Sequence, residues 1–234
     1  MKQNPISLSK RLRAAAEFVR RGAYVADVGT DHAYLPIWLL LEGRIRGGVV
    51  SDINEGPLER AAAHLRAYDK KGLLTPVLCD GLSALAPYCP EDVCILGMGG
   101  DLIARIIAEA PCLKRREVRL ILQPMTHPEV VRRALLADGF VIVEETLVKE
   151  DKIYQIIVAE YCGECREADE FRLLFGEINL ERGGELLCEL LVRWQGILSK
   201  RKAGKASAGE PSPEEDVLLA KIGDYLVTAK EEIT

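Results

Sequence analysis

The chain has 234 residues, of which 48% are hydrophobic and 29% are charged, and its net charge is −5. This length allows one full hydrophobic core with a small additional unit and excludes two large domains. The acidic balance argues against an indiscriminate nucleic-acid coat, and no apolar run approaches the roughly 20 residues that a bilayer span needs.

Residues 8–21 place apolar side chains at helical spacing, with several basic residues between them. The N-terminal segment is charged and amphipathic and lacks the apolar centre of a secretory signal. We therefore expect the protein in the cytoplasm.

Strand and helix patterns then alternate along the chain. The predicted strands are 24–28, 49–53, 76–79, 93–96 and 120–123, and the predicted helices are 35–41, 57–68, 101–110 and 128–137. Two β-rich runs follow, 140–148 and 154–160, joined by the charged turn 149–152. The pattern predicts an α/β fold, a Rossmann-like and mainly parallel sheet with helices on both faces. A hairpin at the end of such a sheet is typical of class I methyltransferases.

Beyond residue 161 the character of the sequence changes. Residues 171–202 are leucine-rich and predict a helical stretch, and residues 217–232 resume a helical period. Between them, residues 203–215 are poor in large apolar side chains and rich in Gly, Ser and Pro, which predicts a loose loop. We expect a domain at 1–161 and a small coiled-coil-like helical domain at 162–234.

The seven cysteines are an odd, scattered set that indicates reduced thiols. The one pattern with metal-ligand spacing is Cys162-Gly-Glu-Cys165, but no second ligand pair accompanies it and the histidines lie far away in the sequence. We expect a turn there and no metal site.

The loop after the first predicted strand holds candidate ligand-binding residues. Gly29 allows a tight turn and a close approach of the backbone to a ligand. Asp31 stands where a dinucleotide fingerprint has its second glycine, and its carboxylate would repel a pyrophosphate but accept hydrogen bonds from an ammonium group. This favours a zwitterionic, sulfonium-bearing ligand over NAD. An ordinary strand-to-helix turn is the alternative.

Three later strand ends extend this candidate site. Asp52 lies about 20 residues after the glycine loop, where a carboxylate can accept hydrogen bonds from a ribose. Asp80 and Gly81 form a turn that can meet an adenine amino group, although a plain turn explains them equally well. Three glycines within residues 97–100 indicate a loop whose backbone lines a ligand closely.

Five ordered motifs resemble one known family. They are residues 8–12 (LSKRL), 27–36 (DVGTDHAYLP), 80–81 (DG), 97–100 (GMGG) and 122–124 (LQP). The chain resembles the bacterial tRNA adenine-N1 methyltransferases that modify the adenine at position 22 in the D-arm, over about residues 7–161. The resemblance implies S-adenosyl-L-methionine as cofactor, tRNA as substrate and no metal.

The motifs and the resemblance together assign three sets of site residues. The expected cofactor-binding residues are Asp27, Gly29, Asp31, His32, Asp52, Asn54, Asp80, Gly81, Gly97, Met98, Gly99 and Gly100. The expected catalytic residues are Asp31, Tyr34 and Met98, where Tyr34 would stack on the flipped base or serve only to pack its helix. The expected RNA-binding residues are Lys10, Arg11, Arg13 and Gln123.

Two departures from the family pattern stand out. Met125 occupies a position where relatives carry Asn, and residues 203–215 form the loose insert described above. Two other functions retain part of the pattern: a methyltransferase for a small molecule or a protein would need the cofactor motifs only, and a non-catalytic RNA-binding module would not need them. The sequence does not indicate the oligomeric state.

Overall fold

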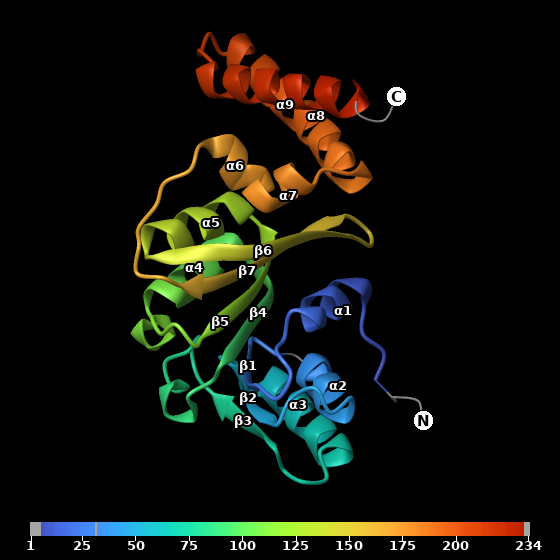
Figure 1. Cartoon of the computed structure of the whole chain (residues 1–234), viewed down its shortest axis with the longest axis vertical. Coiled ribbons are helices and arrows are strands. Elements are labelled where there is room, and N and C mark those ends of the chain that lie inside the picture. Colours follow the sequence, from blue (N-terminus) through green and yellow to red (C-terminus); the bar gives the residue numbers. More distant parts are fainter. Residues whose placement is uncertain (1–5, 31, 232–234) are drawn as a thin grey trace. The chain divides into compact units, whose positions relative to one another are not determined.

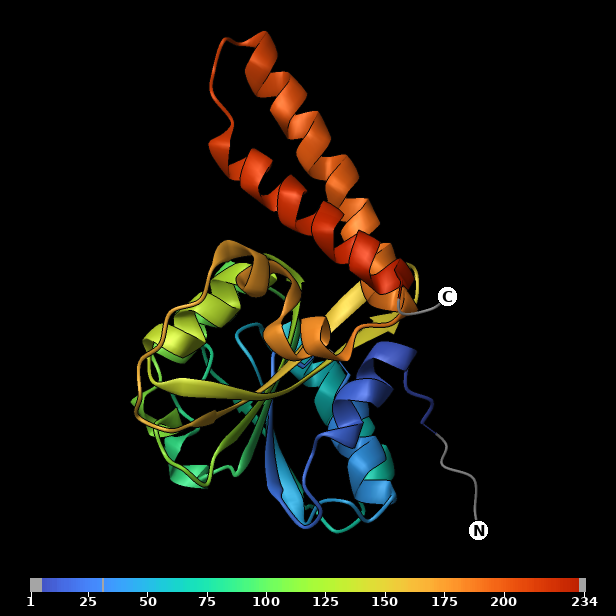
Figure 2. The same ribbon diagram turned by 45° about the horizontal axis from the view of Figure 1, so that its top comes forward.

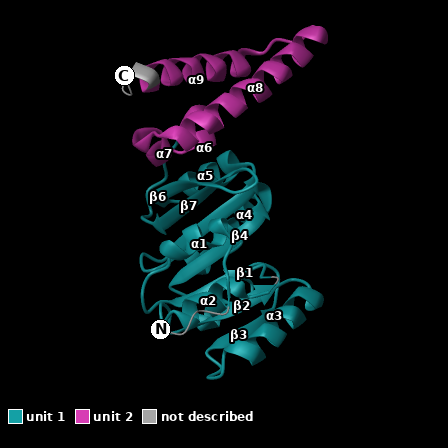
Figure 3. Ribbon diagram, turned by 90° about the vertical axis from the view of Figure 1, so that its right-hand side faces the viewer, with its two compact units in different colours: residues 1–167 teal, residues 168–234 magenta. Residues whose placement is uncertain are grey.

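The computed structural model describes residues 6–30 and 32–231 (Figure 1). The chain divides into two compact units, Met1–Glu167 and Ala168–Thr234 (Figure 3). The division lies six residues beyond the boundary expected from the sequence. The residues that follow the last strand belong to the first unit because they remain hydrogen-bonded to it: the Arg166 N–H donates to the Leu136 carbonyl over 2.9 Å.

The first unit is built on a seven-stranded sheet in the order β3-β2-β1-β4-β5-β7-β6. Its strands are β1 (Tyr24–Val28), β2 (Gly47–Asp52), β3 (Leu74–Leu78), β4 (Asp92–Gly99), β5 (Arg119–Thr126), β6 (Phe140–Lys149) and β7 (Ile153–Tyr161). Strand β7 runs antiparallel to both neighbours, and all other pairs are parallel. The turn between β6 and β7 therefore lies at the same edge as the carboxyl ends of β1 to β5. The predicted parallel sheet with a terminal hairpin is confirmed.

Helices cover both faces of this sheet (Figure 1, Figure 2). One face carries α1 (Lys10–Glu17), α2 (Tyr34–Leu41) and α3 (Glu55–Tyr68), and the other carries α4 (Gly100–Ala108) and α5 (Pro128–Ala137). Two short 3-10 helices, η1 (Ala86–Tyr88) and η2 (Pro111–Leu113), lie in the connections. Within β1, Val25 packs toward the first group and Ala26 toward the second, which explains why this strand reads as continuously apolar.

The glycine-rich segment after residue 96 differs from its prediction as a loop. Strand β4 continues through Gly99, with register irregularities on either side of Met98, and α4 begins at Gly100. Gly97 has a φ of 80°, and a Cβ on Gly100 would lie 2.2 Å from the His127 carbonyl oxygen. The glycines serve an irregular strand end and a close strand-to-helix corner, so no separate loop is needed.

The second unit contains α6 (Glu170–Phe175), α7 (Glu177–Arg182), α8 (Glu185–Ser207) and α9 (Pro213–Glu231). The helical stretch predicted from residue 171 is interrupted at Gly176 and at Gly183 and Gly184, all of which have positive φ. Helices α8 and α9 lie side by side as a hairpin (Figure 1, Figure 2).

The loop predicted for residues 203–215 is too long, since only residues 208–212 connect the two helices. Helix α8 extends to Ser207 and α9 begins at Pro213, where a proline is favourable in the first turn. Lys205 forms an ion pair with the buried Glu215 over 2.7 Å and Lys202 pairs with Asp216, so ionic contacts join the two helices near their connection. Alanine and lysine are also good helix formers, which offsets the glycines in this segment.

Candidate functional site

The loop after β1 is held tightly against the end of β2. The N–H groups of Gly29 and Thr30 both donate to the Ser51 carbonyl, over 2.7 and 3.0 Å. The Thr30 hydroxyl accepts a hydrogen bond from the Ala33 N–H over 2.9 Å, and Ala33 itself adopts a left-handed conformation. Asp31 lies outside the described residues.

Asp27 supplies a buried carboxyl group directly below this loop. Its exposed fraction is 8%. Burial, the larger effect, raises the pKa of Asp27 to about 6, while a hydrogen bond with Thr30 opposes that rise. A ligand cation near this carboxylate would favour its charged form. The environment therefore fits the cationic ligand expected at the loop.

Gly29 and Met98 bring the ends of β1 and β4 into direct contact. Gly29 has a φ of 74°, and a Cβ at this position would lie 1.9 Å from the Met98 Cε atom. The left-handed conformation favours glycine, and a side chain here would also require the flexible Met98 side chain to move. The two residues that the sequence assigned to different strand ends thus form one surface.

The polar residues after β2 and β3 lie in different environments. The Asp52 Oδ1 atom accepts a hydrogen bond from the Asn54 N–H over 2.8 Å, and Asn54 starts α3 without a side-chain cap. Asp80 forms a bidentate ion pair with Arg105, in which the two guanidinium nitrogens lie 3.1 and 3.3 Å from the two carboxylate oxygens. Sequence reasoning missed Arg105. Gly81 has a φ of 56° and lies against Ile106 of α4.

Three aromatic rings cluster beside the β1 loop. The rings of His32, Tyr34 and His64 stand 5.0 to 5.3 Å apart and are close to parallel. The Nδ1 atom of His64 also lies 2.9 Å from the His32 carbonyl oxygen. Tyr34 is 39% exposed, so one side remains accessible. Sequence reasoning missed His64, which comes from the middle of α3.

Arg11 and Gln123 connect α1 to the end of β5. The Arg11 guanidinium donates to the Gln123 side-chain oxygen over 2.6 Å, and a Cβ on Gly97 would lie 3.5 Å from the same guanidinium. Gln123 is fully buried, and the RNA contact expected of it stays a prediction. Its amide instead bonds to Arg11 and to the Pro124 carbonyl.

Other basic and polar groups lie around this edge. Lys10 is exposed at the start of α1, and the Arg13 guanidinium stacks over the Trp38 ring at 5.1 Å. Gly99 lies close to Thr126, and the neighbouring His127 ring contacts the Asp101 carboxylate over 2.5 Å. That hydrogen bond lowers the pKa of Asp101. Sequence reasoning missed the His127–Asp101 pair, which joins the first turns of α4 and α5.

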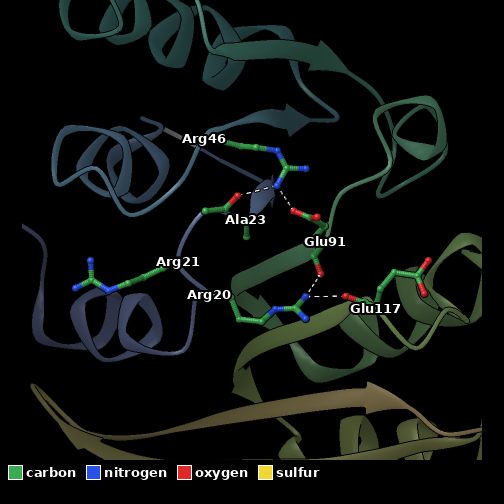
Figure 4. A pocket seen from close by; sticks show the side chains of 7 residues that line it. Arg20, Arg21, Ala23, Arg46, Glu91 and Glu117 are labelled. Carbon is green, nitrogen blue, oxygen red and sulfur yellow. Dashed lines mark hydrogen bonds and ion pairs between the residues drawn. The ribbon is translucent and has the colours of Figure 1, made fainter.

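A hollow at the opposite edge of the sheet has a volume of about 240 Å³ (Figure 4). Two of its arginines, Arg20 and Arg46, form hydrogen bonds and ion pairs with the protein itself. Arg20 donates to Asp92 and to the carbonyls of Glu91 and Glu117, while Arg46 donates to the Gly22 carbonyl and pairs with Glu91. These contacts tie the amino ends of the strands together. The hollow lies away from the carboxyl edge that holds the candidate site.

Three further features concern the described residues alone. Residues 6–30 and 32–231 contain no group of three or more His, Cys, Asp or Glu side chains that could hold a metal ion. The Cys162 thiol donates to the Gly139 carbonyl over 3.3 Å, which ties this cysteine into the turn after β7. No helix in the described part of the chain is long and apolar enough to cross a membrane.

Known proteins resemble this chain in sequence and in structure. A family of methyltransferase domains matches residues 8–157. The tRNA (adenine(22)-N(1))-methyltransferase of Bacillus subtilis is 36% identical over 161 residues, which make up 67% of this chain and 66% of that protein. The alignment therefore leaves about a third of the Bacillus relative unmatched.

Two solved structures match over nearly the whole chain. One is a Streptococcus pneumoniae protein, described as a candidate tRNA (m1A22) methyltransferase, in complex with S-adenosyl-L-methionine. It is 31% identical, covers 94% of this chain and all of its own, and has a TM-score of 0.83. The other is the B. subtilis M1A22 tRNA methyltransferase, 26% identical over 98% of this chain and all of its own, with a TM-score of 0.81. The chain belongs to the bacterial tRNA (m1A22) methyltransferase family, within the class I methyltransferases.

Proposed function

We propose that this protein transfers a methyl group from S-adenosyl-L-methionine to N1 of the adenine at position 22 of tRNA, in the cytoplasm. The observation that carries the proposal is the likeness to the Streptococcus relative with bound S-adenosyl-L-methionine, which extends over 94% of the chain. The tRNA named for the Bacillus relative supplies the substrate class.

The residues at the carboxyl edge fit such a cofactor. Gly29 has a left-handed φ that favours glycine, and the absence of a side chain leaves its backbone open to a ligand. Asp52 uses only its Oδ1 atom within the described residues, so Oδ2 can accept a hydrogen bond from a ribose. The buried Asp27 favours a cationic group nearby. Asp80 would contact an adenine amino group only by sharing its carboxylate with Arg105.

The reaction depends more on the alignment of the two reactants than on a catalytic base. When bound, S-adenosyl-L-methionine supplies an electrophilic methyl group on a sulfonium ion. Adenine N1 carries a lone pair at neutral pH, so holding it in line with that methyl group contributes several kcal/mol. The base must leave its stack to reach the site, and Tyr34 can stack on it. Backbone carbonyls near Gly97 and Gly99 can accept from its exocyclic amino group.

The decisive experiment compares two tRNA transcripts. The purified protein is incubated with radiolabelled S-adenosyl-L-methionine and either an unmodified tRNA carrying adenine 22 or the same tRNA with guanine 22, and the product nucleoside is identified. We expect N1-methyladenosine from the first transcript only. Equal labelling of both would reject position 22, and no labelling despite cofactor binding would reject tRNA as substrate.

A pair of variants tests the cofactor assignment separately. Asp52→Ala should weaken S-adenosyl-L-methionine binding by about 1–3 kcal/mol, since it removes a charged hydrogen-bond acceptor. Asp224→Ala changes an exposed carboxylate in the second unit and should leave that affinity unchanged. Isothermal titration calorimetry measures both. Equal affinities for the two variants would remove Asp52 from the cofactor site.

A further inference from the structure

We propose that Arg11 and Lys152 form a phosphate-binding site for the RNA strand that presents the target adenosine. The inference rests on the proposed function and adds to it a binding site that includes Lys152, a residue of the β6–β7 turn. Both cations lie over one aromatic ring: the Arg11 guanidinium is 5.6 Å and the Lys152 Nζ 5.1 Å from the centre of the Tyr154 ring. Two cations therefore converge on one ring, where a single anion can contact both.

Neither cation is neutralised by a carboxylate within the described residues. The Arg11 guanidinium donates to the neutral Gln123 side chain, and the Lys152 ammonium donates to the Met125 carbonyl over 3.1 Å. Several other basic residues of the first unit form ion pairs with Asp or Glu; they are Arg20, Arg44, Arg46, Arg105, Lys114, Arg119 and Arg132. Arg11 and Lys152 therefore keep charge for an external anion.

The two nearby carboxylates are engaged by other donors. Glu150 accepts from the Arg11 backbone N–H over 3.2 Å, and Asp151 accepts from the Tyr154 hydroxyl over 2.8 Å. The hydrogen bond from Tyr154 lowers the pKa of Asp151, and Lys152 adds a smaller electrostatic effect in the same direction. The turn thus uses its acidic residues to fix the backbone of α1 and the ring of Tyr154. The cationic ends stay available.

The Arg11 side chain is held in place by its surroundings. Its partner Gln123 is fully buried and also donates to the Pro124 carbonyl over 2.8 Å, so the amide cannot rotate without losing a contact. The Tyr154 ring, 6% exposed, forms the floor under both cations. A cation that is already oriented loses less conformational entropy when it binds an anion.

The location favours RNA phosphate over the carboxylate of the cofactor. Tyr154 lies on β7, three strand spacings from β1 in the order β1-β4-β5-β7, which is about 14 Å. Most of the cofactor candidates instead lie at the ends of β1, β2 and β3, and the others, residues 97–100, lie at the end of β4. Arg11 reaches toward Gly97 on β4, at the edge where the target base would meet the methyl group. A cationic pair on the far side of that point can bind the backbone of the incoming nucleotide.

The salt dependence of tRNA binding tests this site. We would measure the affinity of unmodified tRNA for the full-length protein at several KCl concentrations, using fluorescence anisotropy with S-adenosyl-L-homocysteine present. Arg11→Gln and Lys152→Gln should each weaken binding and reduce the slope of log Kd against log [KCl] by about 0.7–0.9, as expected for one lost phosphate contact. The double variant should lose about twice as much of the slope.

Matched variants separate charge from structure. Arg116→Gln removes an exposed cation just before β5, at the opposite edge of the sheet, and should leave the slope unchanged. Arg11→Lys and Lys152→Arg retain the charge and should restore most of the slope, even where the contact with Gln123 is lost. Calorimetric titration should give the same affinity for S-adenosyl-L-methionine in every variant.

Each outcome has one meaning. A smaller slope in the two Gln variants, with unchanged cofactor affinity, supports the site. A wild-type slope in both variants overturns it while leaving the proposed function intact, provided that the wild type methylates tRNA. A loss of cofactor affinity in Arg11→Gln without a change in slope assigns Arg11 to the cofactor and also overturns the site. If the wild type binds no tRNA, the proposed function and the phosphate site both fail.

Discussion

At the scale of single residues, Asp27 links the pH dependence of stability to the candidate site. Its pKa is raised from 3.8 to about 6 by burial. Between these two values the folded protein binds more protons at Asp27 than the unfolded chain does, so the free energy of unfolding falls as the pH rises. A shift of this size corresponds to at most about 3 kcal/mol.

Asp27→Asn should remove this dependence. The stability of the variant relative to the wild type should increase between pH 4 and 7, because the wild type alone bears the cost of a buried charge. Urea unfolding at a series of pH values, without cofactor, measures the difference. A constant difference across the range would show that Asp27 does not titrate with a raised pKa.

Gly29 can be compared with a glycine of similar conformation. The φ angles of Gly29 and Gly22 are 74° and 78°, but a Cβ on Gly22 would have no neighbour within 4 Å. Both Ala variants should lose about 1–2 kcal/mol through the left-handed backbone. Only Gly29→Ala should also displace Met98 and weaken S-adenosyl-L-methionine binding, by about tenfold or more. Urea unfolding and calorimetric titration measure the two effects.

A double variant serves as the control for this comparison. If the clash with Met98 lowers the stability of Gly29→Ala, the double variant Gly29→Ala with Met98→Ala should be more stable than Gly29→Ala alone. Equal cofactor affinity in Gly29→Ala and Gly22→Ala would show that the close approach at Gly29 is not used by the ligand.

At the scale of elements, a buried ion pair joins α5 to the terminal hairpin. Arg132 donates to Glu145 of β6 and to Gln155 of β7, each over 2.7 Å, and both members of the ion pair are almost completely buried. Arg132→Leu should destabilise the protein by about 3–5 kcal/mol, because Glu145 would keep a buried charge without its partner. Thermal unfolding followed by circular dichroism measures the change.

The double variant distinguishes charge from packing. Arg132→Leu with Glu145→Leu removes both charges and should be more stable than Arg132→Leu alone. A double variant that is less stable than the single one would mean that side-chain packing, and not the unpaired charge, dominates the loss.

The central strands could be predicted because they bury both faces and so form short apolar runs. Strand β1 has the bounds predicted from the sequence, 24–28. Strands β4 and β5 extend beyond their predicted bounds at both ends, and β2 and β3 begin two residues earlier and end one residue earlier than predicted. The end of β4 was harder, since Gly97 and Gly99 are turn formers by composition yet continue the strand through an irregular register. The length of the connection between α8 and α9 was predicted wrongly for a related reason, because ion pairs such as Lys205 with Glu215 depend on tertiary packing.

The residues of the candidate site could likewise be predicted only where they do not depend on tertiary packing. Gly29 and Asp52 could be proposed because they lie at the carboxyl ends of predicted strands, where parallel sheets bind ligands. His64 could not, since its ring meets His32 only after α3 packs beside the β1 loop. Lys152 had an unused signal: a terminal hairpin on a parallel sheet must place its turn at the ligand-binding edge.

At the scale of the whole molecule, the two units have separate interiors. The first unit contains two hydrophobic cores, one on each face of its sheet. The second has its own buried side chains, including Leu187, Leu190, Leu191 and Ile222. Every candidate cofactor residue lies between residues 27 and 100, within the first unit. Cofactor binding should therefore be independent of the second unit.

A chain that ends at Glu167 should separate cofactor binding from RNA methylation. We expect it to bind S-adenosyl-L-methionine as the full chain does, because the cofactor candidates and both cores of the sheet remain. Its methylation of tRNA should fall by about tenfold or more, since a large substrate that contacts both units binds bivalently and loses that advantage with one unit. Calorimetric titration and methyl transfer at limiting tRNA measure the two properties. Full methylation by the shortened chain would show that the second unit adds nothing to tRNA binding, and lost cofactor binding would show that the first unit depends on it.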